Sequence, residues 1–188
     1  MADVDFSDRE SAERWFGGQT PETRCVMSSR AVLRVLSNIS LVDAAHFEHL
    51  TLICFRAVLT SAARGLGIGE TVLRLDAAAA QSEDSLPHSL VRLDQGTPID
   101  PFAASNVFSA AVNTTRANYS AHGAANSIDE AIKSAIHIDG FAVALITVEL
   151  NSDQAALNTT ASDLFKRPVW AYKTAPKAYP LCSGKTTC

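Results

Sequence analysis

Two histidines at the start of a predicted helix are the residues of this chain best suited to bind a metal ion. Asp43, His46 and His49 lie together in the sequence Asp-Ala-Ala-His-Phe-Glu-His. Histidines three residues apart share one side of a helix, and imidazole and carboxylate groups are metal ligands. The spacing differs from the four-residue interval of metalloprotease helices, and a polar first turn explains the same residues. A metal-dependent helical-bundle enzyme is therefore the alternative hypothesis.

Other residue types capable of chemistry do not form a catalytic motif. Gly184-Lys185-Thr186 matches the end of a phosphate-binding loop, but the first glycine of that motif would fall at Tyr179 and no helix can follow. No serine lies in a Gly-x-Ser-x-Gly elbow, and the five histidines are scattered. We therefore expect no cofactor and no enzymatic activity.

The four cysteines are expected to be reduced. Cys25 and Cys54 fall on apolar helix faces, where a free thiol behaves as a small apolar side chain. Cys182 and Cys188 lie in a tail at a spacing that matches neither a zinc site nor a redox pair. The acidic N-terminus does not resemble a signal peptide, which favours a cytoplasmic location.

Charge is distributed unevenly along the chain. The net charge is −4, but every charged residue from Lys166 onward is basic, so the body is acidic and the tail is basic. An acidic body repels nucleic acid and attracts basic protein surfaces, although the same surplus also serves solubility. The longest apolar stretches, residues 50–59 and 141–150, are too short to span a bilayer. We expect neither a nucleic-acid partner nor a membrane span.

Capped, alanine-rich segments with helical periodicity fill most of the sequence. N-terminal signals include Ser7 with Glu10, Thr20 before Pro21, Asp43, Asp100 before Pro101, Ser127 with Glu130, and Thr160 with Asp163. The predicted helices cover residues 8–16, 21–39, 44–64, 70–80, 101–121, 127–136, 141–150 and 161–166. Residues 141–150 could also form a strand, but we predict a helix because a lone strand would leave its backbone without partners.

Three helical faces lead to expectations about packing. The helix over 21–39 should present Arg24, Arg30 and Arg34 on an exposed basic edge. The helix over 44–64 is apolar nearly all round, which predicts a central position. The helix over 101–121 carries a face of small side chains that would let another helix approach closely.

The predicted fold is all-α. A chain of 188 residues with 47% apolar and 19% charged residues fits one globular domain. We expect a single-domain bundle of about seven helices over residues 1–172, and a flexible basic tail over 173–188. Trp170 and Tyr172 should fold back onto the bundle as an aromatic plug.

Three segments carry a resemblance to other proteins. They are Arg30 to Leu36, Phe55 to Ala63, and Ala161 to Trp170, which includes a Leu-x-x-x-Pro-x-Trp ending. These segments resemble alanine-rich helical proteins of alphaproteobacteria, especially rhizobia, which have no assigned catalytic residues. Small all-helical proteins of this kind are similar to immunity proteins that protect a bacterium from its own secreted toxin. The resemblance therefore implies a protein-binding function.

The leading hypothesis is a non-enzymatic immunity protein that occludes a secreted antibacterial toxin. An acidic helical surface would cover a basic active site, and buried apolar anchors would slow release. The candidate partner contacts are Glu83, Asp84, Asp94 and Asp100. A further alternative is an adaptor domain that oligomerises through the small-residue face of residues 101–121.

Overall fold

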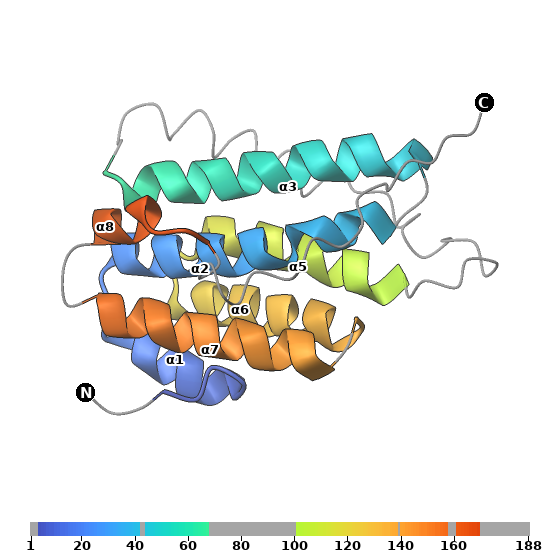
Figure 1. The fold of residues 1–188 in the computed structure, drawn as a ribbon. Helices are drawn as coiled ribbons and strands as arrows, with labels where there is room; N and C mark the ends of the chain where they lie inside the picture. Colours follow the sequence, from blue (N-terminus) through green and yellow to red (C-terminus); the bar gives the residue numbers. More distant parts are fainter. Residues whose placement is uncertain (1–3, 42–43, 68–100, 139, 158–160, 170–188) are drawn as a thin grey trace.

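The computed structural model describes residues 4–41, 44–67, 101–138, 140–157 and 161–169, and all regular structure within these ranges is helical. The α-helices are α1 (Arg9–Gly17), α2 (Pro21–Val35), α3 (Ala44–Gly65), α5 (Pro101–Arg116), α6 (Ala121–Ile136), α7 (Gly140–Ala156) and α8 (Ala161–Lys166). A 3₁₀ helix, η1 (Leu36–Leu41), continues from α2. The helices pack as a bundle (Figure 1), which confirms the predicted all-α class.

Helix α2 lies at the centre of the bundle. It contacts α3, α5, α6, α7 and α8, and most of its side chains are buried. Thr20 caps its N-terminus, and Pro21 occupies the first turn as predicted. The α-helix ends at Val35 and not near Ile39, because η1 tightens the last turns.

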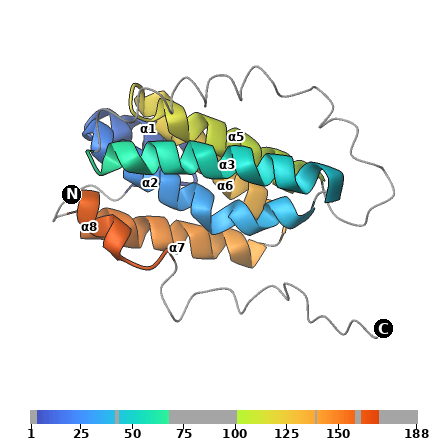
Figure 2. The ribbon, with the colours of Figure 1, turned by 90° about the horizontal axis from the view of Figure 1, so that it is seen from above.

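The predicted central position of α3 is wrong. Figure 1 places α3 at one edge of the bundle, and Figure 2 shows it overlying α2, α5 and α6. One side of α3 is buried through residues such as Ile53, Cys54 and Val58, whereas Leu52 and Leu59 are exposed. Helix α3 therefore has apolar residues on all sides, but other described residues cover only one of these sides.

The N-terminal helix packs its aromatic end against the core. Asp8, and not Ser7, caps α1, because the Asp8 carboxylate accepts hydrogen bonds from two backbone amides of the first turn. The ring of Trp15 packs edge-on against Phe6 at 5.4 Å and against Phe16 at 4.9 Å between centroids. Both phenylalanines are buried, so this cluster seals one end of the bundle.

Helices α5 and α6 pack through small side chains. The small-residue face of α5 is buried, including Ala103, Ala110 and Thr114. The hydroxyl groups of Ser127 and Ser134 on α6 donate to the carbonyl oxygens of Ala110 and Ala103 at 2.9 and 2.8 Å. This face is therefore used inside the chain, which contradicts its predicted role in oligomerisation.

The boundary between α5 and α6 also differs from the prediction. Helix α5 ends at Arg116, and Ser120 caps a new helix that begins at Ala121. Ser127, predicted as the cap, is instead a buried residue within α6. Small apolar residues lie on both sides of this turn. The helical periodicity of the sequence therefore continues across it and does not reveal where α5 ends.

The remaining predictions about elements are confirmed or lie outside the described residues. Residues 141–150 belong to the single helix α7, and α8 covers 161–166 as predicted. Cys25 and Cys54 are buried free thiols. Within the described ranges, no helix is long and apolar enough to cross a membrane. The helix predicted over 70–80 and the tail over 173–188 lie outside the described residues.

Candidate functional site

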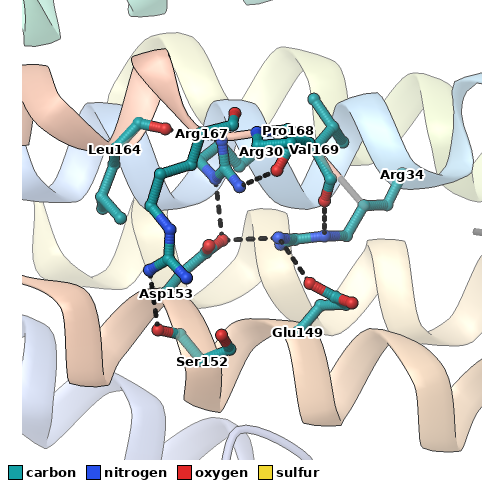
Figure 3. Close-up of polar contacts among 9 residues, drawn as sticks. All are labelled: Arg30, Arg34, Glu149, Ser152, Asp153, Leu164, Arg167, Pro168 and Val169. Carbon is teal, nitrogen blue, oxygen red and sulfur yellow. Dashed lines mark hydrogen bonds and ion pairs between the residues drawn. The ribbon is translucent and has the colours of Figure 1, made fainter. Parts of the chain in front are cut away.

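A buried cluster of charged residues joins α2 to α7. Arg30 and Arg34 lie one turn apart on α2, and both donate to Oδ2 of Asp153 on α7, from Nε of Arg30 at 2.9 Å and from Nη2 of Arg34 at 2.6 Å (Figure 3). Glu149, one turn before Asp153, places Oε2 at 3.9 Å from Nη2 of Arg34. All four side chains are at most 5% exposed. We call these four residues the arginine cluster.

The arginine cluster also holds the C-terminal strap, which we define as residues 164–169. Arg30 donates to the carbonyl oxygens of Leu164, Arg167 and Pro168 at 2.7, 3.0 and 2.7 Å. Arg34 donates from Nε to the carbonyl oxygen of Val169 at 2.9 Å. Figure 3 shows the strap and α7 converging on the two guanidinium groups from different sides. Two side chains of α2 therefore fix both α7 and the end of the described chain.

The electrostatics of the cluster indicate a structural role. Burial lowers the pKa of Arg34, and the nearby Asp153 carboxylate opposes this shift. Two guanidinium groups face two carboxylates, so the cluster is balanced in charge. Nη1 of Arg34 is buried and has no hydrogen-bond partner among the described residues. The cluster holds α2, α7 and the strap together inside the protein, and the described residues in contact with it provide no nucleophile.

The predicted exposed basic edge of α2 is therefore wrong for two of its three arginines. Arg30 and Arg34 are buried, and Arg24 is half-buried with Nη2 donating to the carbonyl oxygen of Asn118 at 3.2 Å. The sequence contained one relevant signal. Two arginines four residues apart match two carboxylates four residues apart, Glu149 and Asp153, as expected for facing helices.

An exposed apolar surface runs along the outer side of α3 and continues to Leu66, which directly follows this helix. Leu52, Phe55, Leu59 and Leu66 are 56%, 43%, 62% and 44% exposed. At 3.6 residues per turn they fall on one narrow face, and the half-buried Ala62 lies beside them. We call Leu52, Phe55, Leu59, Ala62 and Leu66 the α3 stripe.

Two charged residues accompany the α3 stripe. Glu48 and Arg56 are exposed, and they lie one turn before and one turn after Leu52. Among the residues that the structure describes, neither takes part in an ion pair. Both charges are therefore available to a molecule that covers the stripe.

A polar contact on the surface joins α1 to α6. Nδ1 of His122 is 3.0 Å from Oε2 of Glu13, and its Nε2 is 3.0 Å from Nδ2 of Asn126. The imidazole and the carboxylate are 53% and 40% exposed. Exposed pairs of this kind contribute little to stability, and no described nucleophile contacts the imidazole.

The structure places few of the residues predicted from sequence to form a site. Glu83, Asp84, Asp94 and Asp100, the predicted partner contacts, lie outside the described residues, as does Asp43. His46 and His49 belong to the first turns of α3, but their side chains are also outside the described part. Within the described ranges, no three His, Cys, Asp or Glu side chains are grouped to hold a metal.

Comparisons with known proteins do not identify a family. No protein-family model, no curated protein and no solved structure matches the chain.

Proposed function

We propose that this protein is a non-enzymatic module that binds another protein through the α3 stripe, and that the partner is a secreted antibacterial toxin. The exposure of four large apolar side chains on one helical face is the observation that supports binding. Contiguous apolar surface of this kind is uncommon on a monomer and is typical of interaction sites. Burial of large apolar side chains in the core of an interface stabilises a complex.

The mechanism we propose is occlusion. The α3 stripe anchors the partner, and the rigid bundle behind it covers the partner's active site. Rigidity favours affinity because a preordered surface loses little conformational entropy on binding. The arginine cluster contributes by fixing α7 and the strap to α2, the helix on which α3 packs.

The choice of a toxin as partner has a different basis. It comes from the resemblance to immunity proteins and from the acidic residues of the body. Glu83, Asp84, Asp94 and Asp100 stay predicted contacts with a basic toxin surface. Such charges would accelerate association, while the apolar anchors on α3 would slow dissociation.

The test begins with the native host. The tagged protein is purified from it, the bound protein is identified, and that protein is expressed in a sensitive bacterium with and without this chain. We expect growth to be rescued by the wild type and by Val148→Asp, which changes an apolar residue of α7 that is 57% exposed. Leu59→Asp should abolish rescue although the variant folds normally, as checked by circular dichroism. A Leu59→Asp variant that protects as well as the wild type would contradict the proposal.

A further inference from the structure

We draw no further inference here: the strongest candidate, the apolar outer face of α3 with the charged Glu48 and Arg56 beside it, belongs to the site already described, and these two opposite charges do not indicate what kind of segment covers it.

Discussion

Asp153 is the residue on which the arginine cluster depends. One carboxylate oxygen accepts hydrogen bonds from two guanidinium groups, and all three side chains are buried. Assembling buried ions is costly, so the intact cluster contributes little net stability relative to an apolar core. Loss of Asp153 is strongly destabilising, because the two buried guanidinium groups would then have only the Glu149 carboxylate to balance them in a medium that solvates ions poorly.

We predict that Asp153→Ala lowers the free energy of unfolding by about 3–5 kcal/mol. Urea denaturation followed by circular dichroism would measure the change. Lys166→Ala is the matched control, because it removes an exposed pair in which the lysine is 76% exposed and only 2.6 Å from Asp163. This control should cost less than about 1 kcal/mol. Equal losses in the two variants would show that burial does not govern the strength of these pairs.

The buried thiol of Cys54 lowers the free energy of unfolding as the pH becomes alkaline. Burial raises its pKa from 9.0 to about 12. Between these values the folded thiol keeps its proton while the unfolded thiol releases it, so rising pH favours unfolding. The contribution is complete below pH 9 and is lost as the pH approaches 12. Between pH 8 and pH 10, the wild type should lose about 1 kcal/mol more stability than Cys54→Ala. Parallel losses in the two proteins would contradict this assignment.

At the scale of elements, the turn between α5 and α6 brings the backbones of the two helices close together. Gly123, in the first turn of α6, lies so close to Arg116 that an added Cβ would be 2.8 Å from its Cβ and 2.9 Å from its carbonyl carbon. Backbone at this distance cannot move aside like the end of a flexible side chain. A glycine is therefore required where the chain reverses.

We predict that Gly123→Ala destabilises the protein by about 1–3 kcal/mol. Gly17→Ala is the control, since an added Cβ at Gly17 would contact nothing within 4 Å. The control should be neutral or slightly stabilising, because alanine restricts the unfolded chain more than glycine does. Thermal unfolding of both variants would decide the matter, and a similar melting temperature for the two would contradict the close packing.

The sequence predicts where helices form far better than it predicts which side of each helix is buried. Caps at Thr20 and Pro21 and the periodicity of 141–150 specify local structure, and the helices form there. The exposed side of α3 could not be predicted, because which part of an all-apolar helix is covered depends on its neighbours. The arginine cluster was missed for the same reason, since Arg30 and Asp153 are 123 residues apart.

At the scale of the whole molecule, the arginine cluster ties the end of the described chain to its centre. The strap receives four hydrogen bonds from α2. Arg167 of the strap also donates to the carbonyl oxygen of Ser152 on α7 at 3.4 Å. The last described residues are thus part of the folded core and not an appendage to it.

We predict that a chain ending at Thr160 is much less stable than a chain ending at Ala175. The shorter chain loses all strap carbonyl oxygens, and hydrogen bonds from a charged donor contribute about 1.5–3 kcal/mol each. The longer one keeps every strap contact. Melting temperatures and proteolysis rates of the two chains against the full protein would measure the difference. Equal resistance of both truncated chains would show that the strap is dispensable.

The linkage between α2 and the strap also bears on biosynthesis. Arg30 and Pro168 are 138 residues apart, so the arginine emerges from the ribosome long before its carbonyl partners exist. A domain whose folding depends on a segment that is synthesised late cannot complete folding before that segment has emerged. Nascent and prematurely terminated products would therefore expose uncompensated guanidinium groups and apolar helices. We therefore expect cellular proteases to cleave such fragments faster than the finished protein.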